Sequence, residues 1–171
     1  MKNKTIRFIL AGFFLCAAAG PLSAQEKPGV EQKLEAAAGE LNKEYSEGRQ
    51  RVEAKIKAEF KVDDALLIGL HFKKMNNGDI AIALGLAQSM PRGITDNNLH
   101  EVVALREGPP EAGWGKVAKD LGLKLGPVIG RLKKISAEVR KQERSDTAKK
   151  IKEEKAEKLK KAGKKGQPGK I

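Results

Sequence analysis

Residues 79–86 have the sequence DIAIALGL, and residues 116–123 have the sequence KVAKDLGL. The two stretches match at a constant offset of 37 residues, with apolar side chains, an alanine and a glycine at equivalent positions. The segments before them match at the same offset, so residues 63–91 and 100–128 look like two copies of a helix–turn–helix pair. Because one such pair cannot bury its apolar faces alone, we expect the two copies to close a single core. A chance agreement of short helical patterns is the alternative.

The surrounding sequence predicts an all-α fold. We expect a compact domain of helical repeats over residues 62–139, an amphipathic helix over residues 29–61 and a basic, Lys/Glu-rich tail over residues 140–171. Apolar residues recur every three or four positions from Val30 to Phe60. This spacing indicates one helix of about thirty residues that packs on the body or in a short coiled coil. The tail is either an exposed helix or partly disordered.

Capping residues locate the helices of the repeats. Asp63 and Thr95 are typical N-caps, and Gly122 is typical of a helix end. Pro127 suits the first turn of the last helix. The helices expected between these signals span residues 64–75, 79–89, 97–107 and 114–121, and the last helix begins near residue 126.

The first residues have the three-part order of a secretory signal peptide. A basic head contains Lys2, Lys4 and Arg7. An uncharged apolar run from Phe8 to Gly20 follows, and small residues lead to a predicted cut after Ala24. As a helix this run would span about 20 Å, which is short of the roughly 30 Å hydrocarbon core of a membrane. We expect a periplasmic or secreted protein; the alternative is a buried N-terminal helix of a cytosolic protein.

The only cysteine, Cys16, lies in this segment. Cleavage after Ala24 would leave a protein without a disulfide, a thiol nucleophile or a thiolate metal site. A lipoprotein site is disfavoured because Phe14 and Leu15 precede the cysteine instead of small residues. Helix packing alone would then stabilise the mature chain.

Aromatic residues are few, with five Phe, one Tyr and one Trp in 171 residues. Three of them, Phe8, Phe13 and Phe14, lie in the predicted signal peptide. The core therefore depends on aliphatic side chains. This composition argues against a large enzyme fold and against an aromatic-lined ligand pocket.

The net charge of +12 is concentrated at the C-terminus. Residues 131–171 hold 16 basic and six acidic side chains, whereas residues 25–130 hold 15 basic and 16 acidic ones. A nearly neutral body with a polycationic arm favours docking on an anionic envelope surface, such as phospholipid headgroups or lipopolysaccharide phosphates, or on an acidic protein. The alternative is a solvated tail that only keeps the protein soluble.

The candidate partner-binding residues combine these basic positions with the only tryptophan. Trp114 lies between two glycines. It is either an anchor that fills the interface between the repeats or an indole left uncovered for a partner or a glycan. The candidate residues are Trp114, Lys124, Arg131, Lys133, Lys134, Arg140, Lys141, Lys149 and Lys150.

Residues 114–123 resemble the second helix and turn of a DNA-binding helix-turn-helix. Ala118 would let two helices approach, and Gly122 would form the left-handed turn. The resemblance implies nucleic-acid binding as an alternative function, with the basic tail neutralising phosphates. Residues 125–130, where a recognition helix would begin, offer no polar or basic side chain to meet base edges.

As a whole, the chain is similar to small, uncharacterised exported proteins of Gram-negative bacteria. The similarity covers roughly residues 62–135. It is carried by Gly93-Ile94-Thr95-Asp96, Gly108-Pro109-Pro110, Gly113-Trp114-Gly115, Ala118 and Leu121-Gly122. The resemblance implies export and a helical fold, and it implies no activity.

The sequence predicts no catalytic, cofactor-binding or metal-binding residues. His100-Glu101 lacks the second histidine of a zinc-protease helix, and His71 has no partner at ligand spacing. Asp63-Asp64 is better explained as a pair of helix-start acids. Asn76-Asn77-Gly78-Asp79 lacks the alternate acids and the bidentate glutamate of an EF-hand. We expect a non-enzymatic, exported binding or scaffold protein and rank an unrecognised hydrolase last.

Overall fold

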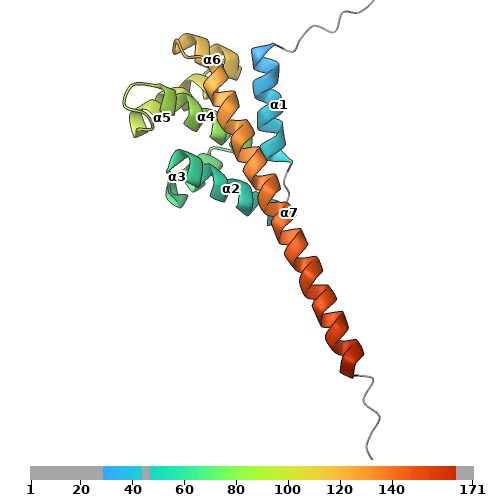
Figure 1. Ribbon diagram of the computed structural model, residues 1–171. Helices are drawn as coiled ribbons and strands as arrows, with labels where there is room; N and C mark the ends of the chain where they lie inside the picture. The colour runs from blue at the N-terminus through green and yellow to red at the C-terminus, as the bar shows by residue number, and fades with distance from the viewer. Residues whose placement is uncertain (1–28, 44–46, 165–171) are drawn as a thin grey trace, which may run out of the picture.

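The computed structural model describes residues 29–43 and 47–164 (Figure 1). These residues form helices and no strand, which confirms the predicted all-α class. The predicted signal peptide, residues 1–24, and its cleavage site lie outside the described residues. The helices are α1 (Val30–Asn42), α2 (Glu47–Phe60), α3 (Asp64–Phe72), α4 (Asn77–Ser89), α5 (Asp96–Glu107), α6 (Trp114–Asp120) and α7 (Leu125–Lys164). In the described ranges, no helix combines the length and the hydrophobicity that a membrane crossing requires.

Helix α4 forms the centre of the core. Every residue from Ile80 to Ala87 is buried, and the helix packs against α1, α2, α5 and α7. A helix that is apolar on all sides is expected to be covered on all sides. Gly85 allows the close approach of α7, because a Cβ atom at this position would lie 2.9 Å from Cγ1 of Val128.

The helix predicted over residues 29–61 is in fact two helices. α1 ends at Asn42 and α2 begins at Glu47, and α2 does not continue the direction of α1 (Figure 1). One straight helix of this length would extend about 45 Å, whereas two shorter helices can each pack against both α4 and α7. The predicted apolar stripe is buried in both helices at Leu34, Leu41, Val52 and Ile56.

The two helix pairs of the repeat are α3 with α4 and α5 with α6. α4 and α6 begin at equivalent positions, Asn77 and Trp114, but α4 has 13 residues and α6 has seven. The pairs differ in the use of the matched glycine. Gly85 is helical and buried, whereas Gly122 has a φ angle of +67° and follows the end of α6. The same short motif therefore continues one helix and terminates the other.

The predicted N-caps are confirmed. The carboxylate of Asp63 accepts a hydrogen bond from the backbone N–H of Leu66, at 2.9 Å, and begins α3. The hydroxyl of Thr95 accepts one from the N–H of Asn98, at 3.2 Å, and begins α5. Each bond satisfies a backbone donor that the first helical turn leaves without a partner.

Helix α7 is a single helix of 40 residues. Its first part packs against α1, α2 and α4, with Val139 as its last buried residue. Its second part extends beyond the body (Figure 1). The tail predicted over residues 140–171 is therefore helical as far as Lys164. Residues 165–171 lie outside the described residues.

Candidate functional site

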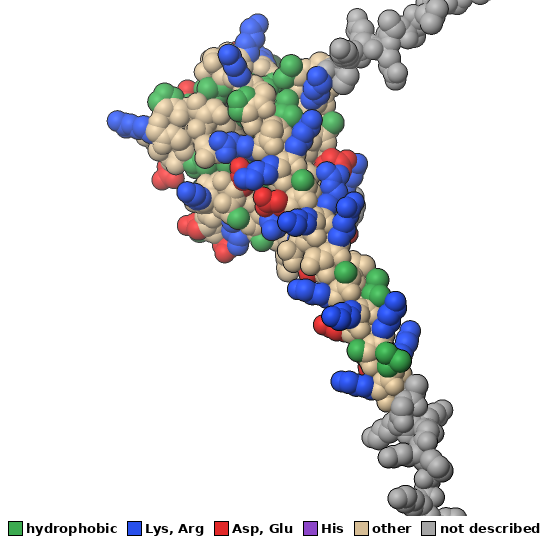
Figure 2. Space-filling view, in the orientation of Figure 1, with side chains coloured by type: hydrophobic (Ala, Val, Ile, Leu, Met, Phe, Trp, Pro, Cys, Tyr) green, Lys and Arg blue, Asp and Glu red, His purple; other side chains and the backbone are tan. Residues whose placement is uncertain are grey.

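The exposed part of α7 presents basic side chains at a distance from the body. Residues 140–164 would extend about 37 Å at 1.5 Å per residue. From Arg140 to Lys161 all side chains are exposed except that of Asp146, which is half-buried. Figure 2 shows Lys and Arg side chains along the projecting part of the helix.

The apolar residues of α7 change sides along the helix. Leu132 is fully buried, whereas Leu159 is 74% exposed. The two leucines are separated by about seven and a half turns at 3.6 residues per turn, so they lie on opposite sides of the helix. Ile135 and Ile151 are likewise separated by about four and a half turns. The exposed apolar residues therefore face away from the side that packs on the body.

The charges of the projecting segment, residues 140–164, are segregated in the same way. The segment holds eleven basic and five acidic side chains. At 3.6 residues per turn, the five acidic residues all lie within a sector of about 100°, on the side that is buried in the first part of α7. These acidic residues are Glu143, Asp146, Glu153, Glu154 and Glu157. The half of the helix that faces away from the body side then carries six basic residues and no acidic one. These basic residues are Arg140, Lys141, Arg144, Lys152, Lys155 and Lys158.

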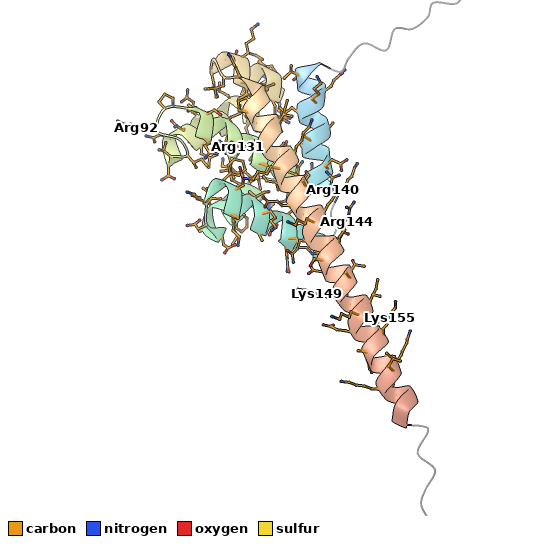
Figure 3. All side chains as sticks on the ribbon, viewed as in Figure 1. Arg92, Arg131, Arg140, Arg144, Lys149 and Lys155 are labelled. Carbon is orange, nitrogen blue, oxygen red and sulfur yellow. The ribbon has the colours of Figure 1, made fainter. Side chains whose placement is uncertain are left out.

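We call the central part of this acid-free side the outer face of α7; Arg140 and Lys158 lie at its edge, and Arg140 pairs with the body. The same side of the first part of the helix carries Lys133 and Lys134 together with one acidic residue, Glu138. Figure 3 shows Arg144 and Lys155 on one side of α7 and Lys149 on the other. The exposed residues that form the outer face are Lys133, Lys134, Ala137, Lys141, Arg144, Ala148, Ile151, Lys152, Lys155 and Leu159.

Two of the predicted basic residues form ion pairs within the fold. Arg131 Nη1 lies 3.3 Å from Oε1 of Glu59, and Lys134 Nζ lies 2.7 Å from Oε2 of the same carboxylate. The hydrogen bond and the charge of Glu59 raise the pKa of Lys134 above its ordinary value. Arg131 and Lys134 therefore join α7 to α2, and their charges are partly balanced inside the molecule.

Arg140 also pairs with the body. Its Nη1 lies 3.5 Å from Oε2 of Glu40 on α1. The pKa of Glu40 is lowered from 4.5, mainly by the hydrogen bond and charge of Lys43 and to a smaller extent by Arg140. This pair lies where α7 leaves the body.

The remaining predicted lysines are exposed but do not form one group. Lys133 and Lys141 lie on the outer face, whereas Lys149 and Lys150 lie on the other half of the helix with the acidic residues. Lys124 lies in the turn before α7. The structure also adds three outer-face residues that the sequence analysis did not single out: Arg144, Lys152 and Lys155. Helical phase could have found them, if the buried side of α7 had been followed into the tail.

Trp114 is buried, which agrees with the alternative of an anchor between the repeats and contradicts the alternative of an indole left uncovered for a partner. The residue is 1% exposed, and its Nε1 donates a hydrogen bond to Oδ1 of Asp79. The flanking glycines have a different role. A Cβ atom at Gly115 would lie 2.6 Å from the carboxylate carbon of Glu31. That carboxylate instead accepts a hydrogen bond from the N–H of Gly115 and satisfies a donor in the first turn of α6.

Residues 114–123, which resemble the second helix and turn of a DNA-binding helix-turn-helix, form α6 and the turn that leads to α7. Ala118 is 1% exposed and Gly122 has a positive φ angle, as the resemblance implied. The first turn of α7 exposes Gly126 and Pro127, which offer no side-chain donor or acceptor to a base edge. The next basic residue, Arg131, is paired with Glu59.

The two histidines are not brought together. His71 Nδ1 lies 3.0 Å from the carbonyl of Met75, and its Nε2 lies 3.2 Å from Glu53. His100 is exposed on α5. Among the described residues, no group of three or more His, Cys, Asp or Glu side chains is arranged to hold a metal ion.

A second exposed surface is apolar and lies on α3. Phe72 is 84% exposed and Ile68 is 54% exposed, one helical turn apart. A shallow groove between α3 and α5 is lined in part by Leu66, Leu99 and Val103. This patch is on a different part of the molecule from the outer face of α7 (Figure 1).

Comparison with known proteins found no match to this chain among family models, curated proteins or solved structures. Its function must therefore be inferred from the chemistry of its own surfaces.

Proposed function

We propose that this protein is a non-enzymatic, exported binding protein that docks on anionic surfaces of the cell envelope through the outer face of α7. The observation that carries the proposal is the segregation of charge on the projecting helix. One half carries six basic residues and no acidic one, whereas the other half carries five of each. A helix whose charges served only to keep the protein soluble would need no such separation.

The outer face suits a surface better than a point ligand. Lys141 and Lys155 are separated by about 21 Å along the helix. A phosphate-rich surface attracts basic residues held near it by about 1 kcal/mol each, and the attraction weakens as salt is added. An acidic protein would be attracted by the same charges, so the test must separate these partners.

The binding test compares two triple variants of the full chain. Lys141→Gln/Arg144→Gln/Lys155→Gln removes three charges from the outer face. Lys149→Gln/Lys150→Gln/Lys160→Gln removes three charges from the other half. Both lower the net charge equally, and glutamine keeps a good helix propensity. Binding to inorganic polyphosphate and to phosphatidylglycerol-containing vesicles would be measured at low and high salt.

We expect the outer-face variant to lose at least about tenfold in affinity and the control variant to lose less than about threefold. Binding of the native chain should also weaken steeply with salt. Equal losses in the two variants would show that net charge, and not the outer face, determines binding. If the native chain binds neither polyanion but captures an acidic protein, the ligand of the outer face is that protein and not the envelope surface.

Export is supported by the N-terminal sequence pattern and is tested separately. Cells expressing the full chain would be fractionated, and the N-terminus would be identified by mass spectrometry. We expect a periplasmic product that begins at Gln25. An intact Met1 in the cytosol would overturn the proposed location.

Nucleic-acid binding is the second candidate function, and the resemblance of residues 114–123 to part of a helix-turn-helix favours it. Of the four basic residues expected to contact phosphates near the turn, Arg131 and Lys134 are paired with Glu59, which leaves Lys124 and Lys133. If duplex DNA is the ligand, Lys124→Gln/Lys133→Gln should weaken binding to a DNA fragment more than Lys152→Gln/Lys155→Gln does. The opposite order would assign any DNA binding to the general polyanion affinity of the outer face.

A further inference from the structure

The outer face of α7 contains apolar side chains as well as charges. Ile151 is 49% exposed and Leu159 is 74% exposed. They are about 12 Å apart along the helix and within about 80° of each other around it. Both lie among the basic residues of the acid-free half. A ligand that is only a soluble polyanion gives no reason for large aliphatic side chains at these positions.

We propose that the projecting part of α7 is an interfacial membrane helix, which lies in the plane of an anionic bilayer and inserts Ile151 and Leu159 between the lipids. This inference rests on the proposed docking function and names its ligand as a lipid bilayer. Helices that lie on membranes combine an apolar strip with lysines and arginines that reach the headgroups. Lysine suits this arrangement because its aliphatic stem packs beside apolar groups while the ammonium stays in the headgroup layer.

The surrounding residues fit such a contact. Lys152 and Lys155 lie between Ile151 and Leu159 on the same face, close enough to pair with phosphates around the inserted side chains. Ala148 continues the apolar strip by one turn towards the body. The acidic side chains, which an anionic headgroup would repel, lie on the half that would face water.

Charge complementarity favours lipid over a second copy of the chain. If the projecting parts of two outer faces packed together, lysines and arginines would face one another without an acidic partner, because no acidic residue lies on this face between residues 140 and 164. Packing an outer face on the other half of a second α7 would also gain little, since that half has equal numbers of acidic and basic residues. Anionic headgroups complement the projecting part of the face.

The body leaves this face accessible. The residues that pack α7 on the other helices, among them Leu132, Ile135 and Val139, lie on the side opposite to the outer face. The outer-face residues of the projecting part, from Lys141 to Leu159, are all exposed and lie beyond the last buried residue of α7, Val139. Figure 2 views this side of α7 and shows apolar side chains between the basic ones in its projecting part.

The test uses the full chain and vesicles of phosphatidylethanolamine with phosphatidylglycerol. Ile151→Gln/Leu159→Gln replaces both apolar side chains and keeps charge and helix propensity. The matched control, Ile151→Leu/Leu159→Ile, keeps the apolar surface. Polyphosphate binding is measured in parallel, because it depends on charge alone.

Insertion is observed directly with a second tryptophan. Leu159→Trp places an indole on the outer face, and Lys160→Trp places one on the other half as a control. Trp114 is buried and contributes a constant background. Lipids with brominated chains quench only an indole that enters the hydrocarbon boundary.

We expect Ile151→Gln/Leu159→Gln to lose at least about tenfold in vesicle affinity while its polyphosphate affinity is unchanged. We also expect the indole of Leu159→Trp, and not that of Lys160→Trp, to be quenched. Suppose that the Ile151→Gln/Leu159→Gln variant binds vesicles as well as the native chain does, and that neither indole is quenched. The helix then only adsorbs to the surface, so the proposed insertion is wrong while the proposed docking function is retained. If the native chain binds polyphosphate but not vesicles, the assignment of a lipid bilayer as the ligand is also wrong. If it binds neither, the proposed function fails as well.

Discussion

The indole Nε1 of Trp114 donates a hydrogen bond to Oδ1 of Asp79, with 2.9 Å between the two atoms. Trp114 begins α6 and Asp79 lies in the first turn of α4, so the bond joins equivalent ends of the two repeats. The guanidinium of Arg106 lies 5.2 Å from the centre of the indole ring. A single side chain thus links α4, α5 and α6.

Replacing Trp114 should therefore destabilise the whole body. We expect Trp114→Phe, which loses the hydrogen bond and part of the ring volume, to lower the free energy of unfolding by about 1–3 kcal/mol. Urea unfolding followed by circular dichroism measures this change. Phe72→Leu on the exposed face of α3 is the control and should change stability by less than about 0.5 kcal/mol. A Trp114→Phe protein as stable as the native chain would show that the repeats do not depend on this contact.

Two helical glycines should respond in opposite ways to alanine. At Gly69, in α3, a Cβ atom would meet nothing within 4 Å, so Gly69→Ala should stabilise the protein by about 0.5–1 kcal/mol through helix propensity. At Gly85, a Cβ atom would lie 2.9 Å from Val128, so Gly85→Ala should destabilise it by about 1–3 kcal/mol despite the same propensity gain. Urea unfolding of both variants tests the pair. A stable Gly85→Ala variant would mean that α4 and α7 can separate without cost.

The pairing of Glu40 predicts a stability change at acid pH. Because Lys43 lowers the pKa of Glu40 in the folded chain, the ionised carboxylate favours folding at pH values above its ordinary pKa of 4.5. That contribution is lost as the pH falls through the lowered pKa. Lys43→Ala should raise the pKa measured by NMR, and Arg140→Ala should raise it less. A larger shift in Arg140→Ala would contradict the order of the two contacts.

Removal of the projecting helix should separate stability from binding. A chain that ends at Arg144 keeps Val139, the last buried residue of α7. Its free energy of unfolding in urea should lie within about 0.5 kcal/mol of the native value, while its affinity for anionic vesicles should fall more than about tenfold. A large loss of stability would indicate that residues beyond Arg144 pack on the body.

Local signals in the sequence predicted the helical class and most helix starts. Asp63 and Thr95 act as caps through hydrogen bonds within three residues, so the information lies close along the chain. The break between α1 and α2 was not predicted, because Val52 and Ile56 continue the apolar spacing of α1. Spacing records which side chains are buried, and it does not record the direction of the helix axis.

The candidate site was predicted by composition and not by geometry. The excess of basic residues in the tail was evident, but the outer face depends on the phase between Leu132, which is buried, and Leu159, which is exposed. For Trp114, the information that was missing is a contact between residues far apart in the chain. Its flanking glycines left both a buried anchor and an exposed indole open, whereas in the structure they make room for Glu31, which lies 84 residues from Gly115 in the chain.

The continuity of α7 has a consequence for the orientation of the body on a bound surface. Since the helix is held by the core at one end, its rotational setting is fixed relative to the body, and contact through the outer face fixes the body as well. α5 packs on α4 and α6, and α3 lies beside α2 away from α7 (Figure 1). The apolar patch of Ile68 and Phe72 would then stay clear of the contact plane in every molecule. A population anchored in this way would present one uniform, oriented layer to the surrounding compartment.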